Sequence, residues 1–354
     1  MCNLDKRTKN IAVIFGGCSP EYSVSLESAS AVLKNLDTKR YTAVMVGISK
    51  TGDWFYYAGA IDAIQNDTWL ESGPCTPAVI SPNRSRHELI VLENEVVRRI
   101  ELDAVLPILH GKNGEDGTVQ GIVQAAGIPL AGCGVLSSAL CMDKDRAHRL
   151  AGAAGVHVPK SLVLNSVSDL KIAYEFAETV GYPVFVKPVK AGSSYGITKV
   201  QTESTLEDAI CGAFEYDNEV ILEENINGFE VGCAVLGTNE LTTGEIDEIE
   251  LSNGFFDFTE KYTLKSSKIY VPARISKEKA EEIKMTAKHI YKTLGCQVFA
   301  RVDMFLTPEG EIVFNEINTI PGFTEHSRYP GMMKAAGFSF REILTQIIEN
   351  SIEE

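Results

Sequence analysis

The rest of this chain is organised around one late stretch, Phe314-Asn315-Glu316-Ile317-Asn318-Thr319-Ile320-Pro321-Gly322-Phe323-Thr324-Glu325-His326-Ser327-Arg328-Tyr329-Pro330. The short apolar run that leads into it, residues 311–314, predicts a strand. Glu316 and Asn318 lie two residues apart, so on a strand both side chains point to the same face. A carboxylate and an amide oxygen on one face are hard ligands that suit Mg²⁺ better than zinc. On this stretch alone, a solvated strand edge before the Pro321-Gly322 turn is the stronger interpretation, and other parts of the chain must decide.

Composition limits the class of protein and its partners. A length of 354 residues predicts two or three domains. The net charge of −15 argues against nucleic acid or an anionic membrane as partner, so a polyanionic ligand would need a local cluster of cations and backbone amides. The eight cysteines include no C-x-x-C pair, and neither a zinc site nor a disulfide framework is expected. Without a signal peptide or an apolar run of roughly 20 residues, we expect a cytoplasmic protein.

The first third of the chain alternates strands, glycine-rich loops and helices. Strands are expected at residues 11–15, 42–48, 78–81, 89–92, 103–109 and 128–131, and helices at residues 25–33 and 118–126. Such alternation is typical of an open α/β sheet, whose ligands gather at the carboxyl ends of the strands. We therefore predict an N-terminal α/β substrate domain over residues 1–137.

Two further domains are predicted after residue 137. A single helix over residues 138–154 opens a compact α+β unit, residues 138–226. Residues 227–354 alternate strands, at 229–237, 245–250, 299–305 and 311–318, with one long helix over residues 277–294. Residues 252–268 form the one long stretch without a regular pattern, and loops of that length are usually lids or disordered. The predicted fold is α/β, with three domains and a mobile lid.

Two segments of the central unit have features of a nucleotide site. The Gly/Ser loop of residues 187–196 joins two strands, and its backbone N–H groups could surround phosphate oxygens, with Lys187 and Lys144 supplying positive charge. The alternative is a flexible surface hairpin. The apolar strand 220–226 ends in polar residues between two units, where its backbone could bind an adenine edge and Glu230 ribose hydroxyls. An edge strand with solvated acids is an equally good interpretation.

A second polar pair repeats the spacing of the opening stretch. Arg301 and Asp303 lie two residues apart on another predicted strand. If the two strands are neighbours, Asp303, Glu316 and Asn318 would form an oxygen-rich Mg²⁺ site that bridges nucleotide phosphates. Arg301 could then stabilise charge on a transferring phosphoryl group or a tetrahedral centre.

Four motifs together resemble the D-alanine–D-alanine ligases of the ATP-grasp superfamily. They are His110-Gly-Lys-Asn-Gly-Glu-Asp-Gly117, Lys187-Pro with Gly192-Ser-Ser-Tyr-Gly196, Arg301-Val-Asp303, and Glu316-Ile-Asn-Thr-Ile-Pro-Gly322. The resemblance extends from Ile11 to the C-terminus. It implies a three-domain ATP-grasp fold, with ATP between the central and C-terminal domains and two Mg²⁺ ions, for which Mn²⁺ can substitute. It also implies a homodimer and a D-alanyl phosphate that a second D-amino acid attacks, giving a dipeptide for peptidoglycan.

The resemblance also implies roles for individual residues. Lys144 and Lys187 would bind phosphates, Glu223, Glu224, Ile226 and Glu230 would contact adenosine, and Asp303, Glu316 and Asn318 would bind the metal ions. Arg301 and the backbone amide of Gly322 would donate to the oxyanion of the tetrahedral centre. In the lid, Lys261 would reach the γ-phosphate, and Tyr262 would bond to Ser193. His110 and Glu115 would face the substrates, and Ser327 would lie near the carboxylate of the second substrate.

One position departs from the family pattern. Members usually carry an acid immediately before Val-Ser in the first loop, where it holds the ammonium group of the first D-alanine, but here Ser23 precedes Val24-Ser25. Three outcomes stay open. Glu21 takes over the role, a water does, or the first subsite binds more weakly.

The identity of the second substrate depends on the end of the opening stretch. Arg328 stands where ordinary D-alanine–D-alanine ligases usually have a leucine that packs on a methyl group. An arginine offers donors for a hydroxyl such as that of D-serine, and Asp247 and Phe256 are candidates for the same pocket. Tyr262 favours an amine acceptor. The sequence around these residues is similar to that of the G-type vancomycin-resistance D-alanine–D-serine ligases. The alternative is that Arg328 pairs with Glu325 or Glu115, which leaves D-alanine preferred.

Overall fold

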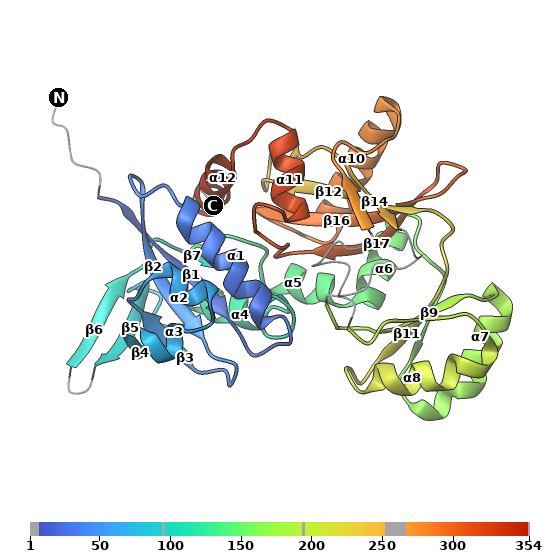
Figure 1. Ribbon diagram of the computed structural model, residues 1–354, viewed down its shortest axis with the longest axis horizontal. Coiled ribbons are helices and arrows are strands. Elements are labelled where there is room, and N and C mark those ends of the chain that lie inside the picture. Colours follow the sequence, from blue (N-terminus) through green and yellow to red (C-terminus); the bar gives the residue numbers. More distant parts are fainter. Residues whose placement is uncertain (1–6, 94–95, 193–194, 252–266, 353–354) are drawn as a thin grey trace.

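The computed structural model describes residues 7–93, 96–192, 195–251 and 267–352, which form three sheets with helices packed on them (Figure 1). The strands of the three sheets lie within residues 9–107, 161–224 and 229–318. The mixed α/β architecture is therefore as predicted, and the domain boundaries after residues 137 and 226 stay a prediction. Among the described helices, none is long and apolar enough to cross a membrane.

The first sheet has seven strands in the order β6-β5-β4-β3-β2-β1-β7. Its strands are β1 (Lys9–Gly16), β2 (Tyr41–Ile48), β3 (Trp54–Tyr57), β4 (Cys75–Ile80), β5 (Glu88–Glu93), β6 (Val96–Glu101) and β7 (Ala104–Pro107). β1 is parallel to β2 and β7, and its apolar residues are buried on both faces. Helix α1 (Tyr22–Asn35) packs on one face and α4 (Thr118–Ala126) on the other. The predicted strand at 128–131 is reduced to a single bridge between Val105 and Leu130.

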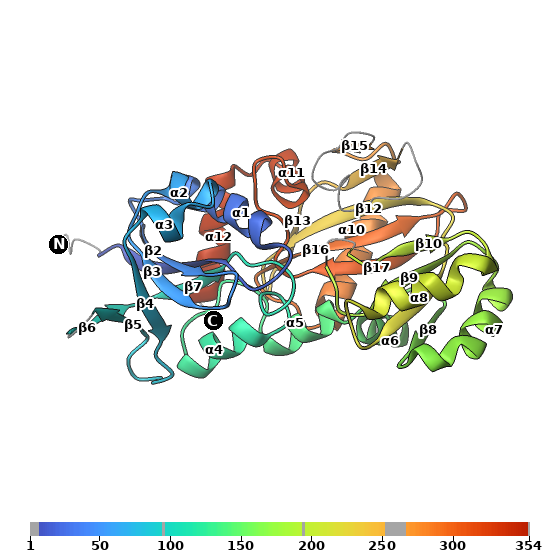
Figure 2. The ribbon, with the colours of Figure 1, turned by 60° about the horizontal axis from the view of Figure 1, so that its bottom comes forward.

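The second sheet has the order β10-β9-β11-β8 and is antiparallel. It consists of β8 (Ser161–Leu164), β9 (Val184–Pro188), β10 (Thr198–Val200) and β11 (Val220–Glu224). Helices α7 (Leu170–Val180) and α8 (Leu206–Phe214) pack on this sheet, and their apolar residues form one buried cluster with those of the strands (Figure 2). The short elements α2 (Ile61–Gln65), α3 (Trp69–Ser72), η1 (Val167–Asp169) and η2 (Glu203–Thr205) lie in connections.

The helix predicted over residues 138–154 is in fact two helices, α5 (Val135–Met142) and α6 (Lys144–Ala153). Asp143 separates them because its backbone is extended and its carboxylate accepts a hydrogen bond from the N–H of Arg146 at 2.9 Å. An aspartate that bonds in this way is an N-cap residue, so a new helix begins directly after it. The break places Lys144 in the first turn of α6, where its side chain reaches the candidate site described below.

The third sheet has the order β15-β14-β12-β16-β17, with β13 (Thr242–Thr243) beside β12. Its other strands are β12 (Phe229–Leu236), β14 (Asp247–Leu251), β15 (Ser267–Tyr270), β16 (Phe299–Leu306) and β17 (Ile312–Asn318). Helix α10 (Lys277–Thr293) packs on one face, and α11 (Arg328–Ala335) contacts β12. The predicted long helix and four strands of this segment are confirmed, with ends that differ by a few residues.

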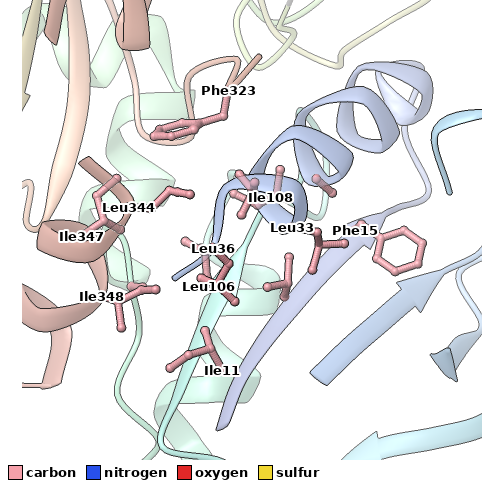
Figure 3. Close-up of a cluster of buried hydrophobic side chains, with 14 of the residues drawn as sticks. Ile11, Phe15, Leu33, Leu36, Leu106, Ile108, Phe323, Leu344, Ile347 and Ile348 are labelled. Carbon is pink, nitrogen blue, oxygen red and sulfur yellow. The ribbon is translucent and has the colours of Figure 1, made fainter. Parts of the chain in front are cut away.

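The C-terminal helix α12 (Phe340–Ile352) packs against α1 and β7 of the first sheet and also against α11, which contacts the third sheet (Figure 3). Leu344, Ile347 and Ile348 lie in one buried cluster with residues of β1, β7 and α1. The ammonium group of Lys9 also lies 3.0 Å from a carboxylate oxygen of Glu349. The last residues of the chain therefore join its first and third sheets.

Candidate active site

A cavity of about 500 Å³ lies between the second and third sheets. Its lining includes all the described residues predicted to bind the nucleotide, which are Lys144, Lys187, Glu223, Glu224, Ile226 and Glu230. Glu316, predicted as a metal ligand, also lines it. Residues from α6, β9, β11, β12 and β17 thus meet in one hollow, and the cations in its lining are Lys144, Lys187, Lys199 and Arg274, which a polyanionic ligand requires.

Lys187 and Glu223 form a buried ion pair on adjacent strands of the second sheet. The lysine Nζ donates to Glu223 Oε2 at 2.5 Å, and the side chains are 9% and 3% exposed. Burial alone would raise the pKa of Glu223, but Lys187 and His148 outweigh it, so this pKa is lowered. His148 Nδ1 lies 3.6 Å from Glu223 Oε1 and Nε2 donates to the carbonyl of Asn315 at 2.7 Å. The charge of Lys187 is therefore held in place before any phosphate arrives.

His148 is a residue of this site that the sequence analysis missed. It follows Lys144 by four residues, so both side chains lie on one face of α6. That spacing beside a predicted phosphate lysine was the signal that could have identified it.

Lys144 connects α6 to the Gly/Ser loop. Its Nζ donates to the carbonyl of Ala191 at 2.6 Å. The same lysine lines a second, much smaller cavity together with Gly192, Glu115, Glu316 and Asn318. The predicted phosphate lysine, the loop and two predicted metal ligands therefore lie around one point.

Four residues form a row across the third sheet. Gly232 on β12 is the register partner of Asp247 on β14 and of Asp303 on β16, and Asp303 is paired with Glu316 on β17. Residues directly opposite each other on neighbouring strands point to the same face. Two residues further along the same two strands, Arg301 is paired with Asn318. The two polar pairs noticed in the sequence are therefore neighbours, as predicted.

The predicted metal ligands suit a magnesium ion by their chemistry. Arg301 donates to both carboxylate oxygens of Asp303 at 2.8 and 2.7 Å, and the Asn318 amide donates to Asp303 Oδ2 at 3.0 Å. No group of three His, Cys, Asp or Glu side chains within the described residues could hold a metal, and this set has two carboxylates and one amide. All of its donors are oxygens once the amide is turned to present its carbonyl. Asp303, Glu316 and Asn318 would therefore hold Mg²⁺ or Mn²⁺.

Glu115 lies between the first sheet and the loop that follows β17. Its carboxylate accepts hydrogen bonds from the N–H groups of Gly111 at 2.9 Å and Ile320 at 3.1 Å. Burial, and then the nearby carboxylate of Glu21, raise the pKa of Glu115 to about 8. This side chain is therefore a neutral acid near pH 7 until a cation arrives beside it.

His110 lies on the same side of the site and is neutral. Burial lowers its pKa to about 4. Its Nε2 lies 3.3 Å from the hydroxyl of Ser28, which accepts a hydrogen bond from the N–H of Phe323 at 3.2 Å. His110 thus supports the loop that carries Gly322.

Glu21, and not Ser23, faces this region. Ser23 is exposed, whereas Glu21 is 5% exposed. A Cβ atom at Gly192 would lie 2.9 and 3.1 Å from the two carboxylate oxygens of Glu21, so the carboxylate lies against the Gly/Ser loop. Of the two residues, Glu21 is therefore the one placed to hold the ammonium group of the first D-alanine, a role that stays a prediction.

The residues predicted to select the second substrate meet at the start of α11. Arg328 donates to both carboxylate oxygens of Asp247, at 2.7 and 2.9 Å, and to Glu230 at 2.7 Å, and Nη1 lies 3.3 Å from Asp303. The Ser327 hydroxyl accepts a hydrogen bond from the N–H of Thr324 at 2.9 Å and lies beside Gly322. The alternative ion pairs of Arg328, with Glu325 or Glu115, are not those that form. Asp247, Ser327 and Arg328 are called the acceptor cluster below.

Four predicted site residues lie outside the described part of the chain. They are Ser193, Phe256, Lys261 and Tyr262. Their predicted roles, like the lid to which three of them belong, stay predictions.

Comparisons with known proteins agree on one family. The model described as "D-ala D-ala ligase N-terminus" matches residues 10–133, and "D-ala D-ala ligase C-terminus" matches residues 150–349. The solved structure of the VanG D-Ala:D-Ser ligase from Enterococcus faecalis is 56% identical, with a TM-score of 0.90 over 98% of this chain and 100% of that one. The vancomycin C-type resistance protein VanC1 of Enterococcus gallinarum is 42% identical over 98% of this chain and 99% of its own. A D-alanine–D-alanine ligase of Caldicellulosiruptor bescii is 41% identical over 97% of this chain and 95% of its own.

Proposed function

Because this chain belongs to the D-alanine–D-alanine ligase family, whose members are ATP-dependent ligases that form a peptide bond, we propose that it joins D-alanine to D-serine. The dipeptide would enter peptidoglycan precursors, and the similarity to a vancomycin-resistance protein of Enterococcus gallinarum supports a role in that resistance. The mixed α/β fold with several sheets is the ATP-grasp fold of this family, as predicted.

The observation that carries the choice of D-serine is the buried pair of Arg328 and Asp247. Its two side chains are 8% and 0% exposed, so an acceptor pocket beside them would have a polar wall that is largely screened from water. A serine hydroxyl can both donate to a carboxylate oxygen and accept from a guanidinium N–H, whereas a methyl group can do neither. If the hydroxyl of D-serine takes up such bonds, the pocket would discriminate against the analogue without the hydroxyl. The 56% identity with a D-Ala:D-Ser ligase supports the same choice.

The reaction has two steps, to which the site residues contribute binding and charge. A carboxylate oxygen of D-alanine attacks the γ-phosphorus of ATP, and the bond to the bridging oxygen breaks to release ADP. The amine of D-serine then attacks the acyl carbon, phosphate leaves with the bonding electron pair, and the ammonium product loses a proton. Lys144 and Lys187 would hold the phosphates, and Glu21 would hold the ammonium group of the first D-alanine.

Charge on the reacting atoms would be stabilised from the third sheet. Arg301 and the N–H of Gly322 would donate to the oxyanion that forms as the amine attacks. Mg²⁺ held by Asp303, Glu316 and Asn318 would neutralise phosphate charge when bound. The hydrogen bond from the N–H of Ile320 to the Glu115 carboxylate holds the loop that carries Gly322.

A D-alanine–D-alanine ligase is the second candidate function. Its specific support is that Nε, Nη1 and Nη2 of Arg328 all already donate to carboxylates of this chain. A guanidinium whose N–H groups are all bonded to carboxylates of this chain could form a closed wall for a methyl group rather than bind a hydroxyl.

The homodimer expected from the resemblance also stays a prediction, which sedimentation would test.

The experiment is an acceptor comparison in one assay. Phosphate release is measured with ATP, Mg²⁺ and D-alanine, with D-serine, D-lactate or further D-alanine as the second substrate, and the dipeptides are quantified. We expect kcat/KM for D-serine to exceed that for D-alanine by at least about tenfold. Equal or better turnover with D-alanine would overturn the assignment to D-serine and favour the second candidate.

A further inference from the structure

We propose that Glu230 is a positioning residue that fixes the orientation of Arg328 and thereby sets the selectivity for the second substrate. The proposal rests on the function proposed above, because it assumes that Arg328 faces the second substrate. The residue was predicted only as a ribose contact. Its carboxylate lines the large cavity and also binds the guanidinium of the acceptor cluster.

The guanidinium is located by carboxylates on three strands. Asp247 on β14 accepts from Nε and Nη2, Glu230 on β12 accepts from Nη1, and Asp303 on β16 lies 3.3 Å from Nη1. The bidentate pair with Asp247 defines the plane of the group, but Nη1 has two carboxylates to choose between. The shorter contact, at 2.7 Å, is the one with Glu230. Glu230 is therefore the nearer of the two carboxylates that compete for Nη1, and the predicted metal ligand Asp303 is the other.

Gly232 makes this arrangement sterically feasible. It lies between Asp247 and Asp303 in the row across the third sheet, two residues after Glu230 on the same strand. A Cβ atom at this position would lie 2.5 Å from Nη2 of Arg328 and 2.6 Å from Oδ1 of Asp247. The guanidinium thus occupies a slot that only glycine leaves open.

Loss of the Glu230 charge should move the guanidinium. A glutamine at this position keeps the shape of the side chain but accepts a weaker hydrogen bond than a carboxylate does. Asp303 then becomes the strongest acceptor for Nη1, and the group turns toward it. The donors offered to a serine hydroxyl shift with it, while a methyl group in the same pocket loses nothing.

The test is the ratio of kcat/KM for D-serine to that for D-alanine at saturating ATP. We expect Glu230→Gln to lower this ratio about tenfold. The matched control is Glu250→Gln, because Glu250 lines the same cavity and also pairs with an arginine, Arg274 at 3.0 Å, on another side of it. The control should leave the ratio unchanged, whatever it does to the KM for ATP. An equal change in both variants would overturn the proposal.

A double-mutant cycle separates positioning from a general effect on the site. If Glu230 acts through Arg328, Glu230→Gln should have no further effect on the ratio in an Arg328→Leu background. An undiminished effect in that background would refute the proposal. Should Glu230→Gln not fold, Gly232→Ala carries the same test, because the added methyl group displaces the same guanidinium and should lower the ratio in the same way.

These outcomes are distinct from a failure of the proposed function. A wild-type protein that prefers D-alanine would overturn the assignment to D-serine, yet a ratio that depends on Glu230 only when Arg328 is present would still support the positioning role. A wild-type preference for D-serine with an unaltered ratio in both Glu230→Gln and Gly232→Ala would sink the positioning role alone.

Discussion

Binding of the first D-alanine should release a proton from Glu115. Burial and the neighbouring Glu21 raise the pKa of Glu115 to about 8, so the free protein carries a proton there near neutral pH. The ammonium group of D-alanine, held by Glu21, would add a positive charge beside both carboxylates. A positive charge beside an acid favours the ionised form of that acid, so the pKa of Glu115 should fall on binding.

The size of the effect follows from the raised pKa. With a pKa of about 8, Glu115 is roughly 90% protonated at pH 7. If D-alanine returns it to its ordinary value of 4.5, about 0.9 proton is released per molecule bound. The complex then binds fewer protons than the free protein, so binding should tighten as pH rises from about 5 to about 8 and level off above it.

Calorimetry without ATP can measure this release. D-alanine is titrated at pH 7 in phosphate and in Tris, whose ionisation enthalpies differ, and the difference in observed heat gives the number of protons. Glu115→Gln has no proton to lose and should show no buffer dependence. Glu21→Gln should show less release, because the charge that raises the pKa of Glu115 is gone. Equal heats in both buffers for the wild-type protein would refute the reasoning.

Three further perturbations test other parts of the site. Arg328→Leu should shift acceptor preference toward D-alanine in the phosphate-release assay. Because it also removes the arginine partner of the buried Asp247, it should lower the free energy of unfolding by about 3–5 kcal/mol. Unchanged selectivity would remove this arginine from the argument. Glu316→Ala or Asn318→Ala should lower kcat by at least about tenfold at saturating ATP by impairing Mg²⁺ binding, and undiminished turnover would displace the metal assignment. Lys187→Met should cost about 3–5 kcal/mol in urea unfolding, because it leaves Glu223 buried without its partner. Adding Glu223→Gln should restore most of that stability but not the binding of ATP, and a double variant as unstable as the single one would contradict the pairing.

The elements of the fold were largely predictable because apolar periodicity is a local property. The strands at β1, β12, β16 and β17 were identified from runs or alternation within each segment, and their faces from the period of two. The break at Asp143 was missed because the apolar pattern continues across it, while the cap depends on a single side-chain hydrogen bond. Helix α12 itself was not predicted, and its packing on the first sheet could not have been, because periodicity shows that a helix has an apolar face but not which sheet that face covers.

Most of the candidate site also came from the sequence, but the partner of each charge did not. Glu21 and Ser23 could not be ranked from their order alone. Around the start of a helix, two residues apart is about 200°, so only one of the pair can face the site, and the packing of α1 makes it Glu21. The spacing of His148 from Lys144 was visible in the sequence, but its contact with Glu223 was not, because the fold alone brings the two side chains together.

The sequence by itself determined which chemistry to expect of this protein: oxygen donors two residues apart on two strands, lysines beside a glycine-rich loop, and an arginine at position 328, where the resemblance predicts an apolar residue. Such patterns depend only on the spacing of residues along the chain, because the geometry of a strand or helix fixes which side chains lie on the same face. Only the tertiary structure decided that Arg328 is shared by Asp247, Glu230 and Asp303, residues up to 98 positions away in the chain. A charge pairs with whichever opposite charges the fold brings within a few ångströms of it, and sequence separation has no influence on that distance.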